Sequence, residues 1–483
     1  MTLPSIPPSL APSRPSRRAV RGTALAVLLV GVLLLANSAV SGVAPGPSAA
    51  PADDASVPYG YSVDIEQRIN TSNPDTEPIP SDAEVTVVAN QGFFPSDENA
   101  ELVAITRNGT LVYHNNTYGV YFDVDPVPGT RYTVEYLASK QLSDCEQFDA
   151  QWCTRNVLER VNLSTGEVER LYAETTPKIT ATRWHDADRV NDTHVALADI
   201  HRDSVRIVDL ERGETTWEWN ATQIYTHAGE SRPQDWTHVN DVEVLDDGTL
   251  MLSMRNMDEV VFVRPGVGYL RGRTLGDAGD HDVLYEQHNP DYVPESRGGP
   301  AVLVGDSENN RVVEYHREGG EWVRAWEWTD PRLQWPRDAD RLPDGRTLVV
   351  DSHGDRVVEV SPNGTVAWAV EVGMPYDVER LGTGDESATG HATDTAQEGR
   401  VVDAGPAGRV LLFLKRALPS KVVNGALFST GAVGAEWFGF ADLLVAVVLL
   451  VTVAAWLVVE YRWAAWSLSG LARGAYRRAR GSR

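Results

Sequence analysis

The chain has 483 residues, of which 43 are basic and 68 acidic, and a formal net charge of −25. A basic footprint is what nucleic-acid binding needs, so this composition argues against that class of function. The length is sufficient for one large domain or two ordinary ones.

Charge is unevenly distributed along the chain. Every acidic residue lies between Gly22 and Tyr461, and arginine is the only charged residue in the two tails outside that range. An acidic, lysine-poor middle region is typical of a protein that stays soluble in high salt, which indicates a halophile. Ordinary secreted proteins can share the same bias.

Two apolar segments flank the acidic region. Residues 22–44 are uncharged and long enough to span a bilayer, and residues 443–459 are at the short end of spanning length. Because both tails are arginine-rich, the positive-inside rule places both termini in the cytoplasm and the middle region outside the cell. The first segment has an alternative interpretation as a cleaved signal peptide, since Arg17 and Arg18 precede it and AVSGVA resembles a cleavage region.

Two further features favour export. The only cysteines, Cys145 and Cys153, are eight residues apart, and outside the cell such a pair predicts a loop-closing disulfide. Asn-x-Ser/Thr sequons also occur throughout the acidic region, which predicts a glycoprotein. They begin at Asn70, Asn108, Asn115, Asn162, Asn191, Asn220 and Asn363.

Within the acidic region, one phrase recurs in place of helical periodicity. HDADRVNDTHVALADI (185–200), HVNDVEVLDDGTLMLSMR (238–255) and RDADRLPDGRTLVVDSHG (337–354) each join polar residues, a turn and a strand. The strand-end residues Asp199, Ser253, Asp306 and Asp351 are 54, 53 and 45 residues apart. Repeats of this length, each a small antiparallel sheet, predict an all-β fold, a β-propeller. Two degenerate units in residues 84–178 bring the expected number of blades to six, with five or seven as alternatives.

These features divide the chain as follows. The Pro/Ala/Ser-rich stretch after the first apolar segment and GTGDESATGHATDTAQEG (382–399) have the composition of tethers. The predicted parts are a cytoplasmic tail and membrane segment (1–44), a linker (45–80), an extracellular propeller (81–380), a flexible linker (381–405), a membrane-proximal segment (406–438), a transmembrane helix (439–461) and a cytoplasmic tail (462–483).

Equivalent positions of propeller repeats lie on the same rim of the central channel. His185, His238 and Arg337 hold one such position, so we expect their side chains to converge on an axial pocket. The strand-end set Asp199, Ser253, Asp306 and Asp351 is expected to converge in the same way. The alternative is that these residues only close turns within or between blades.

Three motifs together resemble the arylsulfotransferase (aryl-sulfate sulfotransferase) family, in a haloarchaeal, membrane-anchored form. They are DWTHVNDVEVLDDGTLMLSMRN (235–256), the Gln-His of EQHNPDY (286–292) and DSENNRVVEY (306–315). The resemblance covers residues 180–375 and extends more weakly back to residue 84. It implies an exported six-bladed propeller that moves a sulfuryl group from a phenolic sulfate ester to a phenol. The transfer passes through a sulfated histidine, with no nucleotide donor, cofactor or metal.

Residue roles follow the motifs. The resemblance assigns His238 and Arg255 to the first motif and His288 to the second. Arg311 comes from the third motif, and His353, in VVDSHGDRVVEV, is the candidate for the sulfated histidine. Imidazole offers a neutral nucleophilic nitrogen and can also transfer protons, and the guanidinium groups suit sulfate oxygens and the phenolate leaving group. The expected substrate-binding residues are Asn240, Trp236, Tyr292 and His281, of which His281 is also a rival for the role of His288.

Two other functions remain open at this point. A non-catalytic cell-surface propeller would use the same polar rim to bind a glycan or a protein. A metal-dependent hydrolase or lyase would use His-Asp pairs as ligands, although their spacings match no defined ligand set. The residues in question are His185, Asp186, His238, Asp241, His281 and Asp282.

Overall fold

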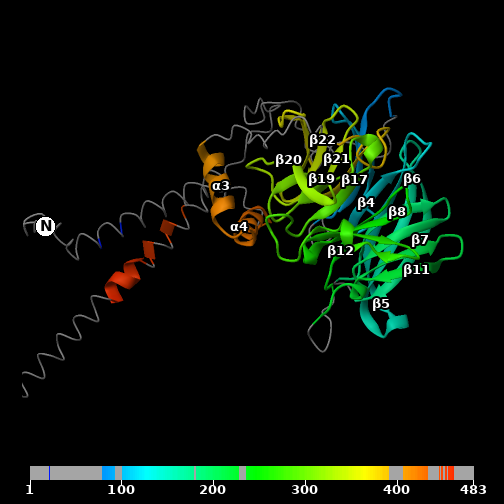
Figure 1. The fold of residues 1–483 in the computed structure, drawn as a ribbon, viewed down its shortest axis with the longest axis horizontal. Helices are drawn as coiled ribbons and strands as arrows, with labels where there is room; N and C mark the ends of the chain where they lie inside the picture. Colours follow the sequence, from blue (N-terminus) through cyan, green and yellow to red (C-terminus); the bar gives the residue numbers. More distant parts are fainter. Residues whose placement is uncertain are drawn as a thin grey trace, which may run out of the picture. The chain divides into compact units, whose positions relative to one another are not determined.

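Six blades, five with four strands and one with five, form the core of the computed structural model (Figure 1). The residues that the structure describes are 79–92, 100–178, 181–227, 235–390 and 406–432, with isolated positions in 21–25 and 445–461. The predicted all-β, six-bladed propeller is confirmed, and the two degenerate units before residue 178 are blades one and two.

Each blade is an antiparallel sheet, and its innermost strand lines the central axis. Blade one contains β25 (Pro375–Arg380), β1 (Val85–Asn90), β2 (Glu101–Thr106) and β3 (Leu111–Asn115). Blade two contains β4 (Val120–Pro126), β5 (Thr133–Cys145), β6 (Ala150–Asn162) and β7 (Glu167–Pro177). Blade three contains β8 (Trp184–Asn191), β9 (His194–Asp199), β10 (Ser204–Asp209) and β11 (Glu214–Asn220).

The other three blades follow in chain order. Blade four contains β12 (Val239–Val244), β13 (Leu250–Met254), β14 (Glu259–Arg264) and the short β15 (Gly268–Tyr269) and β16 (Leu275–Gly276). Blade five contains β17 (His288–Val293), β18 (Ala301–Asp306), β19 (Arg311–Glu318) and β20 (Glu321–Trp328). Blade six contains β21 (Pro336–Arg341), β22 (Thr347–Asp351), β23 (Arg356–Val360) and β24 (Val366–Glu371).

The ring is closed by the two ends of the propeller chain. β25, the last strand, pairs with β1, the first, so blade one combines both ends of the domain. Apolar residues then fill the spaces between neighbouring blades; Trp184, Trp219, Trp328 and Trp368 are each at most 2% exposed. This closure leaves no free edge at the junction, which is how a propeller avoids edge-to-edge aggregation.

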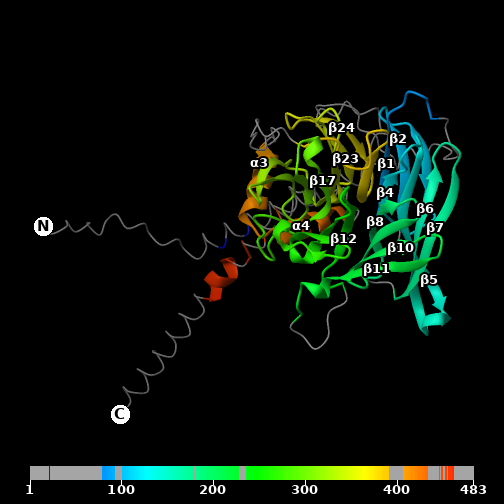
Figure 2. The ribbon, with the colours of Figure 1, turned by 45° about the vertical axis from the view of Figure 1, so that its right-hand side comes forward.

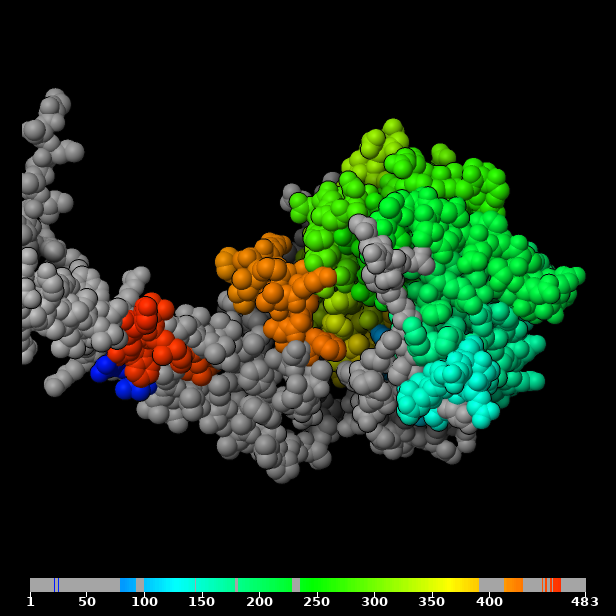
Figure 3. Space-filling model, turned by 90° about the horizontal axis from the view of Figure 1, so that it is seen from below, coloured from blue at the N-terminus to red at the C-terminus, as the bar shows by residue number. Residues whose placement is uncertain are grey.

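Two additions extend beyond the blades. Strands β5 and β6 are each 13 residues long, and their hairpin reaches well past the other blades (Figure 2). Cys145 and Cys153 form a disulfide at its tip. Helix α3 (Pro406–Ala417) lies against the loop between β20 and β21, where the Lys415 ammonium donates to the carbonyls of Pro331 (2.9 Å) and Leu333 (2.6 Å) (Figure 3, orange).

The chain falls into two compact units, residues 54–424 and residues 1–53 with 425–483. In the second unit Arg21 pairs with Glu460 (2.5 Å), so residues that flank the two predicted membrane segments are neighbours. Within the described part of the chain, no helix has both the length and the apolar character needed to cross a bilayer. The predicted span at 22–44 lies almost entirely outside the described residues, and about half of the predicted span at 439–461 does.

Candidate active site at the channel mouth

The inner strands repeat a short pattern in all six blades. Each contains one variable residue followed by Asp or Asn, one further residue, and Asp or Glu: FDVD, HDAD, NDVE, HNPD, RDAD and YDVE. We call the three resulting levels the mouth ring, the first acidic ring and the second acidic ring. The mouth ring consists of Phe122, His185, Asn240, His288, Arg337 and Tyr376.

A backbone irregularity brings the mouth ring to the axis. In every inner strand the pairing register with the next strand shifts at this level. A β-bulge inserts one extra residue and redirects its side chain, so two successive residues can face the channel where a regular strand would present only one. His185 and Asp186 are one such pair, and Arg337 and Asp338 are another.

Ring contacts show that the mouth residues meet. His185 stacks on Phe122 with ring centroids 4.4 Å apart and meets His238 edge-on at 4.8 Å. Tyr376 is 6.0 Å from both His185 and His288. Since these side chains come from different blades, the predicted convergence on an axial site occurs at this level. The predicted equivalence of His238 with His185 and Arg337 is wrong, because Asn240 holds that position in blade four and His238 lies two residues before it.

His288 has a defined tautomer. Its Nδ1 is 3.1 Å from the Glu286 carbonyl, which can only accept, so Nδ1 carries the proton; the same proton is shared with Ser307 Oγ at 2.8 Å. Nε2 therefore carries the lone pair, and among the described residues it makes no hydrogen bond. Burial lowers the pKa of His288 well below 6.5, and the charges of Arg337 and Arg255 lower it further. The imidazole is therefore neutral at physiological pH.

His238 is held in a similar way. The Arg255 guanidinium can only donate, so its Nη1 donates to His238 Nε2 at 3.1 Å, and His238 Nδ1 donates to Asp235 Oδ1 at 2.6 Å. Burial, followed by the charges of Arg255 and Arg337, lowers the pKa of His238 well below 6.5. A neutral imidazole backed by a carboxylate is an arrangement suited to accepting a proton.

Several buried polar atoms at the mouth lack partners within the described structure. They are Nε of Arg255, Nε of Arg337, Oη of Tyr376 and Oδ1 of Asn240. The Arg337 guanidinium lies 4.6 Å from the Tyr376 ring centroid and makes no ion pair in the described part of the chain. Burial lowers its pKa to about 10, so it stays charged at neutral pH. Buried donors without partners are costly and suggest a ligand with acceptor oxygens.

The structure brings together some of the residues expected from the motifs. His238, His288, Arg255 and Asn240 lie at the mouth. His353 is next to it, because its ring packs 4.8 Å from Trp335, which in turn lies 6.4 Å from His288. Trp236 contacts His227 at 5.7 Å and Tyr225 at 6.3 Å.

Three other expected residues are placed elsewhere. Arg311 is engaged with Asp306 (2.6 Å), with Glu327 (3.1 Å) and with two backbone carbonyls. Tyr292 lies four residues past His288 on the same strand, beyond the acidic rings. Its hydroxyl accepts a hydrogen bond from Arg273 Nη2 at 3.2 Å. His281, 47% exposed at its side chain, stacks on Tyr285 and pairs with Asp258.

The expected convergence of the strand-end set is wrong. Asp199, Ser253, Asp306 and Asp351 end the second strand of their blades, away from the axis, and are fully buried. Three of them form ion pairs inside the blade: Asp199 with Arg206, Asp306 with Arg311, and Asp351 with Arg356. They stabilise turns, which is the alternative that the sequence left open.

Residues missing from the motif-based set are Arg337, Tyr376, Asp235 and Ser307. A signal for the first two was present in the sequence, because RDAD and YDVE repeat the pattern that contains His185 and His288. Asp235 acts on His238, three residues later in the same segment, and Ser307 acts on His288 from the turn after β18. The repeat carries no signal for either contact.

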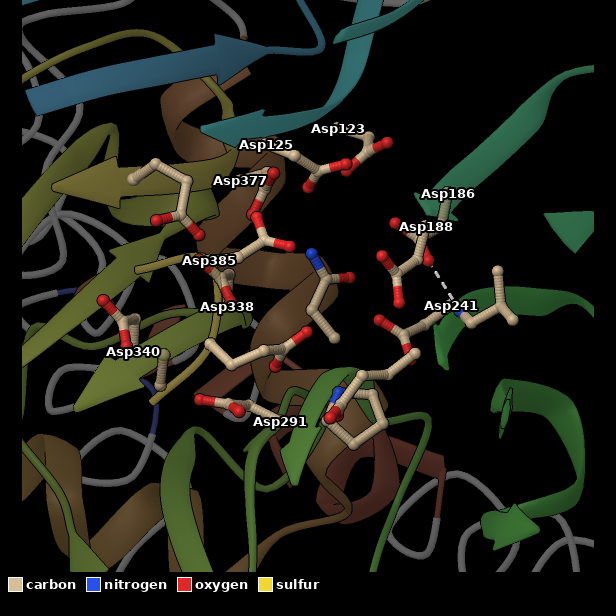
Figure 4. A pocket seen from close by; sticks show the side chains of 17 residues that line it. Asp123, Asp125, Asp186, Asp188, Asp241, Asp291, Asp338, Asp340, Asp377 and Asp385 are labelled. Atoms are coloured by element: carbon tan, nitrogen blue, oxygen red, sulfur yellow. Dashed lines mark hydrogen bonds between the residues drawn. The ribbon is translucent and has the colours of Figure 1, made fainter. Parts of the chain in front are cut away.

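The acidic rings lie directly below the mouth. The first consists of Asp123, Asp186, Asp241, Asn289, Asp338 and Asp377, and the second of Asp125, Asp188, Glu243, Asp291, Asp340 and Glu379. Together with Asp385 and Glu386 they line a cavity of about 70 Å³ (Figure 4).

Comparisons with known proteins return distant solved structures and one family model. A protein of unknown function from Bacteroides caccae aligns at 12% identity and a TM-score of 0.44, covering 62% of this chain and 99% of that one. The periplasmic gluconolactonase of Pseudomonas aeruginosa aligns at 12% and 0.40 over 62% and 99%. A virginiamycin B lyase of Staphylococcus aureus aligns at 8% and 0.36 over 63% and 87%. Similarities this low carry no argument about activity.

No curated protein matches the chain. A family model does: residues 176–325 match that of arylsulfotransferase (ASST). This stretch contains His185, His238, Arg255 and His288, four of the residues gathered at the mouth. The match supports the arylsulfotransferases as the family of this region of the chain.

Proposed function

We propose that the protein transfers a sulfuryl group from a phenolic sulfate ester to a phenol, through a sulfated histidine and without a nucleotide donor. The family match supports the reaction class. The observation that carries the proposal is the neutral His288, whose Nε2 lone pair lies among buried donors that have no protein partner.

The donors suit the substrate. A sulfate ester presents three terminal oxygens and a bridging oxygen, and the Nε–H groups of Arg255 and Arg337 are charged donors for the terminal ones. Tyr376 supplies a hydroxyl whose pKa is raised by burial, so it remains protonated and can donate to the leaving oxygen. Fixed donors in a site shielded from water stabilise developing charge more strongly than water does.

The reaction has two balanced steps. In the first, His288 Nε2 attacks sulfur, an N–S bond forms, the bond from sulfur to the aryl oxygen breaks, and the phenolate leaves with a hydrogen bond from Tyr376. In the second, Arg255 shifts its hydrogen bond from His238 Nε2 to a sulfuryl oxygen, the acceptor phenol gives its proton to the freed nitrogen, its oxygen attacks sulfur, and the N–S bond breaks. Asp235 stabilises the imidazolium that forms on His238.

His353 is the alternative nucleophile, the one favoured by the motifs. Burial lowers its pKa to about 3, so it too is neutral. Its ring contacts Trp335, outside the mouth ring, whereas His288 lies inside that ring. The geometry therefore favours His288 for the attack and leaves His353 at the edge of the site.

The proposed location follows from the sequence. The propeller faces the outside of the cell membrane of a halophilic archaeon, with both termini in the cytoplasm and membrane segments at each end. Asn108, Asn191 and Asn363, which begin three of the sequons, are exposed at turns. A nucleotide sulfate donor is scarce outside the cell, which agrees with transfer between phenols.

The test is phenol-dependent release of 4-nitrophenolate from 4-nitrophenyl sulfate by the full chain in detergent and molar salt. We expect turnover that rises with added phenol, is abolished in His288→Ala and persists in His194→Ala, a control at the start of β9. Loss in His353→Ala with activity retained in His288→Ala would transfer the nucleophile to His353. No release from any folded protein would favour a binding propeller.

A further inference from the structure

The cavity below the mouth has an unusual excess of carboxyl groups. Thirteen of its seventeen lining residues are Asp or Glu, and none is Lys or Arg (Figure 4). Carboxylates brought together away from water must be protonated, hydrogen-bonded or neutralised by a cation.

Hydrogen bonds explain part of this set. Asp186 Oδ2 accepts from the Val242 amide (2.6 Å), and Asp377 Oδ2 accepts from the Val124 amide (2.8 Å). Each of these bonds joins the inner strand of one blade to that of the next. Carboxylates of this kind have a structural role, because they connect neighbouring blades by hydrogen bonds.

Other oxygens in the same cavity have no such role. Oδ2 of Asp241, Oδ1 of Asp291, Oδ1 of Asp340 and Oε2 of Glu379 have no hydrogen-bond partner in the described structure. The four residues are only 6–9% exposed. Buried acceptors that nothing satisfies indicate a missing donor or cation.

Three carboxylates lie close enough together to bind one cation. Oxygens of Glu243 on β12, Asp291 on β17 and Glu386 lie within 4.8 Å of one another. Asp340 on β21 lines the same cavity, and Ser387, next to Glu386, joins the two strands, since its amide donates to Asp291 and its hydroxyl accepts from the amide of Arg341. The charge of Arg297 acts on Glu243 and Asp291, but burial outweighs it and the pKa of both is raised.

Glu386 belongs to a segment that closes this end of the channel, which we call the closing segment (residues 385–390). Ser387 is fully buried; its amide donates to Asp291 (2.9 Å), and its carbonyl accepts from Arg297 (2.8 Å). The sequence predicted a flexible linker from residue 381, whereas the structure packs this part of it against β17 and β21.

We propose that Glu243, Asp291 and Glu386, with Asp340 as a further ligand, bind one divalent cation, Ca²⁺ by preference, at the closed end of the channel. All the ligands are oxygens and there is no His or Cys, which suits a hard cation. Ca²⁺ tolerates irregular carboxylate geometry, and the 70 Å³ cavity leaves room for water ligands. The bound ion ties β12 and β17 to the closing segment and so stabilises the ring.

The test uses the full chain in detergent, freed of divalent ions with EGTA and kept at constant ionic strength. CaCl₂ is titrated in by calorimetry, and thermal unfolding is followed with and without it. We expect one Ca²⁺ per chain and a higher Tm with Ca²⁺. In Asp291→Asn and Glu243→Gln we expect binding to weaken at least about tenfold and the rise in Tm to be lost.

Asp123→Asn is the matched control, because it removes the same charge from the first acidic ring without touching the three ligands. We expect it to bind Ca²⁺ like the unmodified chain. Should a strand variant fail to fold, Glu386→Gln tests the same site from outside the strands. The proposal is overturned by the absence of binding, by equal weakening in Asp123→Asn, or by equal stabilisation of the chain and Asp291→Asn by Mg²⁺, which would indicate screening alone.

Discussion

The two ends of the channel differ in charge although the same six strands build them. Arg337 is followed by Asp338, His185 by Asp186 and Tyr376 by Asp377. One step along the strand therefore exchanges a neutral or cationic group for an acid, and the bulges make both face the axis. A single repeat thus supplies a site for an anion and, directly below it, a region that excludes one.

Burial acts on both ends in opposite directions. It lowers the pKa of His238 and His288 so that they lose their protons, and it raises the pKa of Asp186 and Asp188 to about 7 so that they tend to keep theirs. Desolvation disfavours the charged form of either group. Arg337 is the exception at the mouth, since it stays charged without a carboxylate partner in the described structure.

The largest expected effect comes from removing that charge. Arg337→Gln should lower kcat/KM for 4-nitrophenyl sulfate by about 10²–10³, because the developing sulfate charge loses a fixed donor. Tm should change little, since Arg337 makes a hydrogen bond to Gln91 but no ion pair in the described structure. Steady-state kinetics and thermal unfolding of the same preparation check both expectations. Unchanged kcat/KM would mean that the mouth does not bind the sulfate.

Arg311, unlike Arg337, forms an ion pair with a buried carboxylate. In Arg311→Met the fully buried Asp306 loses its ion pair, so we expect the free energy of unfolding to fall by about 3–5 kcal/mol. Turnover per folded molecule should stay within about threefold, because Arg311 is engaged within its blade. Urea unfolding measures the free energy of unfolding, and active-site titration gives the turnover per folded molecule. A stable variant with abolished turnover would restore the catalytic role expected from the motifs.

The acidic end predicts how stability depends on pH in the absence of divalent cations. The pKa is raised to about 7 in Asp186 and Asp188 and to about 8 in Asp340, so the folded chain holds protons that the unfolded chain releases above pH 4. The free energy of unfolding should therefore fall as pH rises from about 4 to 8, by up to about 1.4 kcal/mol per pH unit for each group until its folded pKa is reached.

The histidines act in the opposite direction at lower pH. The folded pKa of His238 and His288 lies below the unfolded value of 6.5, so their contribution to stability is lost as pH falls below 6.5. Below pH 6.5 the histidines therefore offset part of the fall caused by the carboxyl groups, and urea unfolding at pH 5–8.5 should show a stability that declines as pH rises. Asp340→Asn should flatten the alkaline side, and a stability that rises from pH 6.5 to 8 would contradict this account.

The smallest effect is expected from the disulfide. Cys145→Ser with Cys153→Ser removes a cross-link between residues eight apart, worth at most about 2–3 kcal/mol in the unfolded-chain model. It lies at the tip of the β5–β6 hairpin, which supplies no residue to the mouth. We expect a modest fall in Tm and unchanged kcat/KM; loss of turnover would connect this hairpin to the site.

Local patterns were sufficient to predict the blades. VEVLDDGTLMLSM forms β12 and β13 around Gly248, whose positive φ of 74° suits the turn. The closure by β25 could not be predicted in this way, because its partner β1 lies nearly three hundred residues earlier and local sequence carries no trace of the pairing. The closing segment was misread for a similar reason: its Gly/Ser/Thr-rich composition resembles a tether, yet Ser387 is held by three distant strands and loops.

The expected site residues that lie at the mouth are those that belong to a motif and are also near the channel axis. His238, His288 and Arg255 are near both, whereas Tyr292 and Arg311 belong to motifs but not to the mouth. Four residues of β-strand separate Tyr292 from His288, a distance of roughly 13 Å along the strand. Arg337 was expected at the axis from its place in the repeat, whereas Tyr376 became recognisable only once the bulges showed that the residue before each acidic pair faces the channel.

The most direct test of the central claim is to trap the sulfated enzyme. The full chain is mixed with 4-nitrophenyl sulfate in the absence of a phenol acceptor, quenched at alkaline pH and digested for peptide mass spectrometry. The account predicts a mass increase of one SO₃ group on the peptide that contains His288, which disappears when phenol is added. An SO₃ group on the His353 peptide, or on no peptide despite phenol-dependent turnover, would contradict it.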